Sequence, residues 1–99
     1  MVKHIVLFKL KNEVSVAEKQ AVALKFKAAI EALPSVIPFI KHVEVGININ
    51  PDEQWHIALY SEFNTLEEVK AYAVHPAHVA AAKLLADVKE SRSCVDYES

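Results

Sequence analysis

The sequence predicts an α+β protein of the ferredoxin-like class, with the order strand, helix, strand, strand, helix, strand. Segments rich in β-branched and aromatic residues indicate strands, and segments with apolar residues at helical spacing indicate helices. The strands are expected at 3–11, 39–48, 54–63 and 92–97, the first helix at 15–33, and the second helical segment at 64–90, broken after Val74 by Pro76 into two helices. In this order the four strands form one antiparallel sheet with both helices on one face.

Length and composition limit the classes of protein. The 99 residues suffice for one domain, which we place at 1–99, and 53% hydrophobic residues with 24% charged residues are typical of a globular chain. The net charge of −2 provides no basic surface for a nucleic acid. The apolar run 5–8 is too short for a membrane span, and Cys94, the single cysteine, excludes an internal disulfide. We expect a cytoplasmic protein that binds neither nucleic acid nor membrane.

The first strand is apolar on both faces. Alternation places one set of side chains on each face: His4, Val6, Phe8 and Leu10 on one, and Ile5, Leu7 and Lys9 on the other. The helices can cover only one face of the sheet. The second face is expected to carry Ile5, Leu7, Ile57 and Leu59, which would form an exposed apolar patch on a monomer. We therefore expect a homodimer in which two copies join through their sheet faces.

Local signals define the first helix and the middle of the chain. Ser15 followed by Glu18 forms a capping-box pattern at the start of the helix, and Pro34 stops it near Leu33. Its apolar stripe consists of Val22, Phe26, Ala29, Ile30 and Leu33. Gly46, the single glycine, predicts a bulge or a close backbone approach in the second strand.

The third strand and the second helix supply most of the polar side chains of interest. Period two places His56, Ala58 and Tyr60 on one face of the strand, and we expect this face to lie under the helices. Asn64 or Thr65 caps the following helix. The segment 72–79 then places Tyr72, His75 and His78 around Pro76, which ends one helical run and begins another.

The sequence resembles the stress-responsive A/B barrel (Dabb) family of the dimeric α+β barrel superfamily. The resemblance covers nearly the whole chain and is carried by the segments 2–9, 61–67, 72–79 and 95–97. The most specific of them is Tyr-Ala-Val-His-Pro-Ala-His-Val at 72–79. The family relationship implies a small homodimer, and most members have no assigned activity.

The resemblance also implies roles for particular residues. A plant member of the family closes a linear polyketide chain by an aldol condensation without a cofactor. The tyrosine and histidine that carry this chemistry align with Tyr72 and His78, and two strand histidines of its pocket align with His4 and His56. Ile30 stands where that member has a tyrosine, so the pocket of this chain is lined differently.

These residues suit proton abstraction next to a carbonyl group. A neutral imidazole can take the proton, and a phenol can donate a hydrogen bond to the oxyanion that forms. We assign His78 as the base and Tyr72 as the donor, with His4 and His56 orienting substrate oxygens. The expected apolar walls are Val6, Phe8, Phe26, Ile30 and Ala58. Such a site requires neither a metal nor an organic cofactor.

Several alternatives remain open at this point. The tyrosine and the histidines can equally be satisfied core groups, with His75 as a helix cap, in a non-catalytic binding dimer or a structural stress-response dimer. Zinc on three histidines lacks a supporting helical pair of ligands. The resemblance allows a hard cation on backbone carbonyls at 34–38, and related barrels include cofactor-independent monooxygenases.

Overall fold

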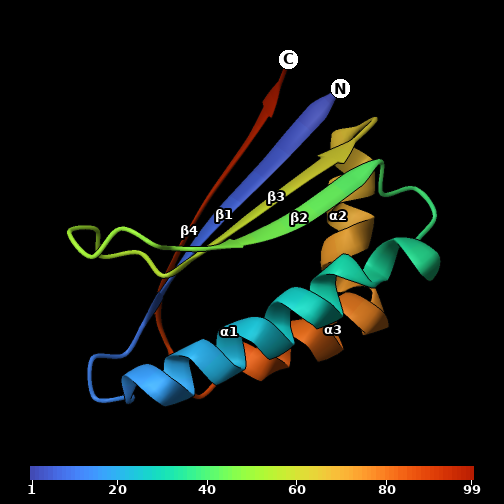
Figure 1. The fold of residues 1–99 in the computed structure, drawn as a ribbon. Helices are drawn as coiled ribbons and strands as arrows, with labels where there is room; N and C mark the ends of the chain where they lie inside the picture. The colour runs from blue at the N-terminus through green and yellow to red at the C-terminus, as the bar shows by residue number, and fades with distance from the viewer.

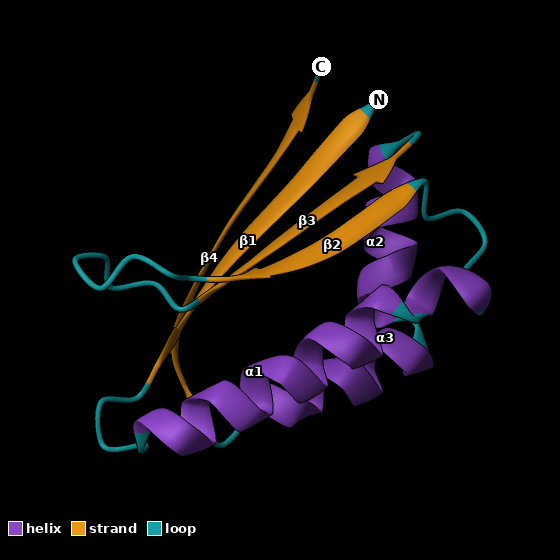
Figure 2. Ribbon diagram, in the orientation of Figure 1, coloured by secondary structure: helices purple, strands orange, loops and turns teal.

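A computed structural model describes residues 1–99 and contains four strands and three α-helices (Figures 1 and 2). Two short 3-10 helices, η1 and η2, lie between them. The elements are β1 (Val2–Leu10), α1 (Val16–Glu31), η1 (Leu33–Ser35), β2 (His42–Ile47), β3 (Ile57–Phe63), α2 (Leu66–Val74), α3 (Pro76–Ala82), η2 (Lys83–Leu85) and β4 (Lys89–Glu98). The order agrees with the ferredoxin-like prediction, in which α2 and α3 together form the second helical segment.

The sheet has the strand order β2-β3-β1-β4, and every neighbouring pair is antiparallel. All helices lie on one side of it, with α1 and α3 side by side and α2 rising at one end (Figure 1). This arrangement is the ferredoxin-like α+β fold that the sequence predicts. The side chains of the sheet therefore divide into an inner set that faces the helices and an outer set that faces away from them.

The inner face of β1 is as expected, whereas that of β3 is not. His4, Val6, Phe8 and Leu10 are all buried. On β3, however, the buried residues are Ile57, Leu59, Ser61 and Phe63, and the register pairs Val6 with Leu59. The prediction that Ala58 faces the helices and that Ile57 and Leu59 face outward was therefore wrong. Burying the larger apolar side chains removes more apolar surface from water, which decides the orientation of the strand.

The helix starts follow the capping signals. The Ser15 side chain accepts a hydrogen bond from the backbone N–H of Glu18, and Thr65 accepts one from that of Glu68. The first helix ends at Glu31, slightly before the expected Leu33, because the chain tightens into η1 around Pro34.

The junction between α2 and α3 is built on one residue. His75 has an extended backbone, ends α2 and begins α3. Its Nδ1 atom accepts a hydrogen bond of 3.1 Å from the backbone N–H of Ala77. Pro76 occupies the first position of α3, where its missing N–H leaves no donor unsatisfied. The expectation that His75 caps a helix at the proline is confirmed.

Strand lengths and the position of the bulge differ from the predictions. β2 and β3 begin at His42 and Ile57, later than expected, whereas β4 begins at Lys89 and is longer than expected. The β2–β3 register is continuous through Gly46, whose backbone has no positive φ. The irregularity lies instead in the β1–β4 pairing, between Lys9 and Leu10. Gly46 faces outward opposite Ala58, where an added Cβ would meet no atom within 4 Å.

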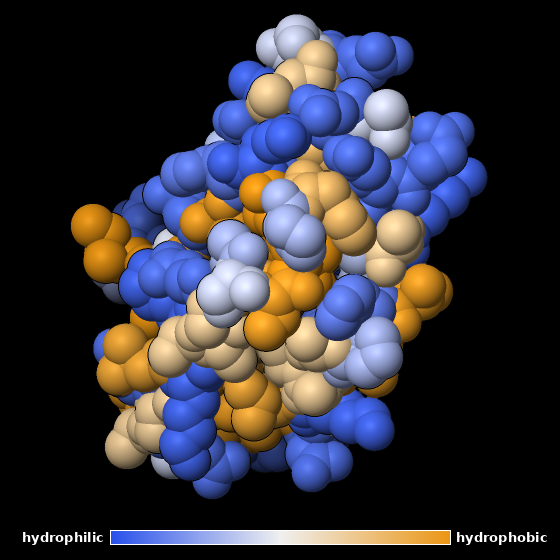
Figure 3. Space-filling model, turned by 90° about the vertical axis from the view of Figure 1, so that its right-hand side faces the viewer, coloured by the Kyte–Doolittle hydropathy of each residue, from blue (hydrophilic) through white to orange (hydrophobic).

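Apolar side chains remain exposed on two sides of the molecule. On the outer sheet face, Ile5 and Leu7 are half-buried, and Val95 and Tyr97 are 52% and 44% exposed. The view onto the α2 end of the molecule shows apolar residues gathered near its centre among hydrophilic ones (Figure 3). Val74, at the end of α2, is 76% exposed. None of the helices combines the length and hydropathy needed to cross a membrane.

The double cap at His75 predicts a specific stability loss. The variant His75→Ala removes the acceptor for the Ala77 N–H, and we expect the free energy of unfolding to fall by about 1 kcal/mol. His75→Asn keeps an N-cap acceptor and should retain most of the stability. Urea unfolding at one fixed protein concentration measures both. Equal stability of the alanine variant and the unchanged protein would contradict the capping role.

Candidate functional site

A cavity of about 100 Å³ lies between the inner sheet face and the helices. Its polar lining consists of His4, Tyr72, His78, Lys89 and Arg92. Its apolar lining consists of Val6, Phe8, Phe26, Leu59, Ala73, Ala82 and Leu85. Because Ala82, Lys89 and Arg92 are exposed whereas Tyr72 and Phe26 are buried, the cavity opens between α3 and β4.

Tyr72 is the most deeply placed polar group of the cavity. Its side chain comes from the last turn of α2 and is only 1% exposed, and its hydroxyl has no hydrogen-bond partner. Buried hydroxyls normally have such a partner, so this group is available to a bound molecule. Burial raises the pKa of Tyr72 far above its usual value, and the nearby positive charge of Arg92 opposes this only in part. The phenol is therefore a hydrogen-bond donor, not a base.

His78 lies against Tyr72, with the ring centroids 4.3 Å apart. Its Nδ1 atom is 3.0 Å from the carbonyl oxygen of Ala73. A carbonyl can only accept, so Nδ1 carries the proton and, in the neutral ring, Nε2 carries the lone pair. Burial lowers the pKa of His78, and the charges of His4, Arg92 and His75 lower it further, against the Ala73 hydrogen bond. Neutral imidazole with a free Nε2 is the form that a general base requires.

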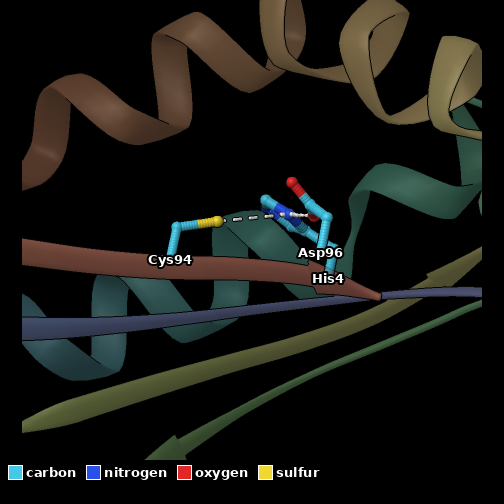
Figure 4. A group of neighbouring side chains, drawn as sticks. All are labelled: His4, Cys94 and Asp96. Atoms are coloured by element: carbon cyan, nitrogen blue, oxygen red, sulfur yellow. Dashed lines mark hydrogen bonds and ion pairs between the residues drawn. The ribbon is translucent and has the colours of Figure 1, made fainter. Parts of the chain in front are cut away.

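His4 is held by a carboxylate. The two strands place His4 of β1 directly opposite Asp96 of β4, and the His4 Nδ1 is 2.5 Å from an Asp96 oxygen (Figure 4). The carboxylate accepts from Nδ1–H, so Nε2 of the neutral ring is free to accept a hydrogen bond. His4 is 7% exposed, and its ring centroid is 6.0 Å from that of Tyr72. The second imidazole thus also borders the phenol.

Cys94 completes a group of potential metal ligands with His4 and Asp96. Their ligand atoms lie within 4.8 Å of one another, and the Cys94 Sγ is 3.6 Å from the His4 Nδ1. All three residue types bind zinc. Burial and the Asp96 charge raise the pKa of the Cys94 thiol, and the Arg92 charge lowers it. A metal ion would have to displace the thiol proton and the His4–Asp96 hydrogen bond beside a guanidinium, so we interpret the group as a hydrogen-bonded cluster.

The structure brings together most, but not all, of the residues expected at the site. Val6, Phe8 and Phe26 line the cavity together with His4, Tyr72 and His78. Ile30 is completely buried in the core and does not line it. Ala58 is exposed on the outer sheet face, so its expected role as a pocket wall was wrong.

His56 was also expected at this site and lies elsewhere. Its backbone N–H donates to the Phe8 carbonyl, and its Nδ1 accepts a 2.9 Å hydrogen bond from the Leu10 N–H. The ring therefore continues the β1 ladder just before β3 begins. It borders a separate cleft with Leu10 and Lys19. Burial lowers the pKa of His56, followed by the charges of Lys19 and Lys9. Because His56 lies elsewhere, His4, His56 and His78 do not form a three-histidine group.

Residues of β4 were not expected at the site. Arg92, Cys94 and Asp96 face inward because they pair with Phe8, Val6 and His4. Alternation alone predicts that these three side chains share one face of the strand. That this face lies under the helices follows only from the pairing of β4 with β1. Lys89 was assigned to the preceding helix, because α3 and the β4 start were not separated by any glycine or proline.

Solved structures place the fold among dimeric ferredoxin-like proteins. A dimeric protein of unknown function from Bacteroides fragilis NCTC 9343 is 63% identical with a TM-score of 0.98, and the match covers 99% of this chain and 95% of that chain. A Dabb family protein from Mesorhizobium loti MAFF303099 is 25% identical with a TM-score of 0.73, covering 99% and 95%.

Sequence comparison identifies the family. The model of the stress responsive A/B barrel domain, Dabb, matches residues 2–99, and the chain therefore belongs to the Dabb family. Olivetolic acid cyclase from Cannabis sativa is 29% identical over 99 residues, which is 97% of this chain and 94% of that protein.

The surroundings of His78 predict its titration. We expect the imidazole signals of His78 to titrate with a midpoint below 6.5, because burial and the charges on β1, β4 and the α2–α3 junction disfavour its protonation. NMR titration, with assignment by His78→Gln, measures the midpoint, and the histidines of the urea-unfolded chain provide the reference near 6.5. The unfolded chain binds this proton more readily, so the His78 contribution should make the protein less stable as the pH falls below about 6.5. A midpoint at or above the reference would contradict the described environment.

Proposed function

We propose that this protein is a homodimeric, cofactor-independent enzyme that removes a proton next to a carbonyl group of a polyketide-like or aromatic substrate. The observation that carries the proposal is the buried Tyr72 hydroxyl, which has no partner and lies beside the imidazole of His78 in a cavity. A protonated hydrogen-bond donor and a neutral base thus border the same small apolar space. The similarity to a protein named as a cyclase supports the same class of chemistry.

The proposed reaction uses each group in the state described above. The His78 Nε2 takes a proton from the carbon next to a carbonyl, and the enolate oxygen accepts a hydrogen bond from the Tyr72 hydroxyl. The enolate carbon then attacks a second carbonyl of the same molecule, and the new alkoxide recovers the proton from the His78 imidazolium. One carbon–carbon bond forms, and no group is oxidised or reduced.

His4 and Asp96 have a supporting role in this mechanism. The Asp96 carboxylate fixes the orientation of the His4 ring through Nδ1, which leaves Nε2 to accept a hydrogen bond from a substrate hydroxyl. The Asp96 side chain does not line the cavity, so we describe it as a positioning residue.

The size of the cavity limits how the substrate binds. Pockets that enclose a drug-sized molecule usually measure roughly 300–1,000 Å³. A space of about 100 Å³ holds only the reacting end of a substrate, and the remainder extends through the opening between α3 and β4. The small volume also favours the second candidate function, a binding or structural dimer without turnover.

The outer sheet face supports the proposed dimer. The homologues of known structure are dimeric, and Ile5 and Leu7 lie at the centre of the face that the helices leave open. Packing two such faces together would bury the outward apolar residues and complete an α+β barrel.

The catalytic roles predict distinct losses of activity. With a linear β-polyketo acid and its thioester, tested separately as substrates, and mass spectrometry of the cyclised product, His78→Gln should lower kcat by roughly 100-fold or more, because the base is lost. Tyr72→Phe should lower it by roughly 100-fold, because the oxyanion loses its donor. His56→Gln is the matched control and should retain activity. Unchanged turnover in His78→Gln would refute the base, and binding without turnover in the unchanged protein would favour the second candidate.

The proposed interface predicts the effect of a charge on the outer sheet face. Leu7→Lys places an ammonium group at the centre of this face, and we expect it to convert the dimer to monomer at micromolar concentration. Val74→Lys, on the exposed end of α2, is the control and should remain dimeric. Analytical ultracentrifugation measures both masses. A fully dimeric Leu7→Lys variant would place the interface elsewhere.

A further inference from the structure

Two positive side chains at the cavity opening have no carboxylate partner. Arg92 and Lys89 both come from β4 and line the cavity. The ion pairs within 4.0 Å join Lys9 to Glu90, Lys27 to Glu31 and two histidines to acidic residues, and none involves Arg92 or Lys89. The lining of the cavity contains no acidic residue. The space thus combines apolar walls with two positive side chains that have no carboxylate within ion-pair distance.

Arg92 is directed toward the reacting groups by the sheet register. It pairs with Phe8, whose side chain is buried under the helices, so Arg92 lies on the inner face of β4. Its charge is close enough to lower the pKa of both Tyr72 and His78. The guanidinium, the phenol and the imidazole also line the same small cavity.

We propose that this cavity selects substrates that carry a carboxylate, which Arg92 binds while Lys89 adds a second positive charge at the opening. The inference rests on the proposed function and names the substrate class of the same site. A guanidinium offers two parallel N–H donors that match the two oxygens of a carboxylate, and most of the residues that line the cavity beside it are apolar. The carboxylate would lie within a few atoms of the carbon that loses its proton.

Binding of the anion would also change the base. In the free protein the charge of Arg92 is one of the causes that lower the pKa of His78. A carboxylate on the guanidinium offsets that charge and raises the affinity of His78 for a proton. The acid substrate would thus strengthen the base that acts on it, whereas a neutral analogue of the same shape would not. An increase in the pKa of His78 on binding of an acid would therefore distinguish a carboxylate site from two surface cations that only contact water.

The experiment compares benzoate with benzamide, which share a shape and differ in charge. Binding to the dimer is followed by NMR of the His78 signals and by calorimetry. We expect benzoate to bind at least tenfold more tightly than benzamide and to raise the His78 titration midpoint. Arg92→Gln should abolish the preference, and Arg92→Lys should restore part of it. Lys89→Gln should reduce it less, and Lys70→Gln, an exposed α2 residue outside the cavity, is the matched control.

Each other outcome counts against the inference. Equal affinity for the acid and the amide, an unchanged preference in Arg92→Gln, or no binding of benzoate would overturn it. Inorganic phosphate that shifts His78 as strongly as benzoate would overturn the choice of a carboxylate. A third result would be that the unchanged protein binds benzoate and benzamide equally and that Tyr72→Phe weakens the binding of both. This result would refute the anion site and leave the proposed function intact. Loss of turnover in His78→Gln tests the proposed function independently.

Discussion

The end of α2 at a proline is the constraint on which the site depends. Pro76 lacks a backbone donor and disfavours helical backbone in the residue before it, so the helix cannot continue through His75. The Nδ1 of His75 compensates by accepting from the first free N–H of α3. An unbroken helix would hold Tyr72 and His78 at a fixed spacing along one axis. The junction instead brings their rings to a centroid distance of 4.3 Å from two different helices.

The sheet supplies the other half of the site through β1. This strand lies between β3 and β4, so its inner side chains are bordered on both sides by those of its neighbours. One neighbour contributes Leu59 beside Val6, and the other contributes Asp96 beside His4. The burial of His4 is therefore accompanied by a hydrogen-bonded partner, as a buried polar group requires. Only Tyr72 is left with an unsatisfied buried polar atom.

Local patterns predicted the fold well because capping, proline and apolar spacing act within a few residues. Ser15, Thr65 and His75 each perform the capping role that their neighbours indicate. The inner residues of β1 were also predictable, because alternation places Val6, Phe8 and Leu10 together on one face and the charged Lys9 on the other. On β3 both faces carry apolar residues, and which face is buried depends on the side chains of elements that are distant in the sequence. That choice moved Ala58 outward, and His56 was separated from the site by its hydrogen bond to the β1 ladder.

The site residues on β4 were not predicted, for a different reason. Arg92 and Asp96 are charged and largely exposed, and such residues usually belong to solvated surface. Their inward direction depends on a pairing with β1 that joins opposite ends of the chain. Spacing within one segment cannot reveal such a contact. Tyr72 and His78, in contrast, lie only six residues apart, so their proximity could be predicted from one short segment.

Tyr72 and His78 lie on a helical junction, apart from the strand that supplies the positive charges of the cavity. The phenol and the imidazole are held by α2 and α3, whereas the charges and most of the apolar walls belong to strands and to α1. A substitution on β4 can thus change the charge at the opening without changing the helices that hold Tyr72 and His78, although the charge of Arg92 also acts on the pKa of both groups. A small chain with this division can change the ligands that it admits through substitutions on its strands, while the helical junction stays the same.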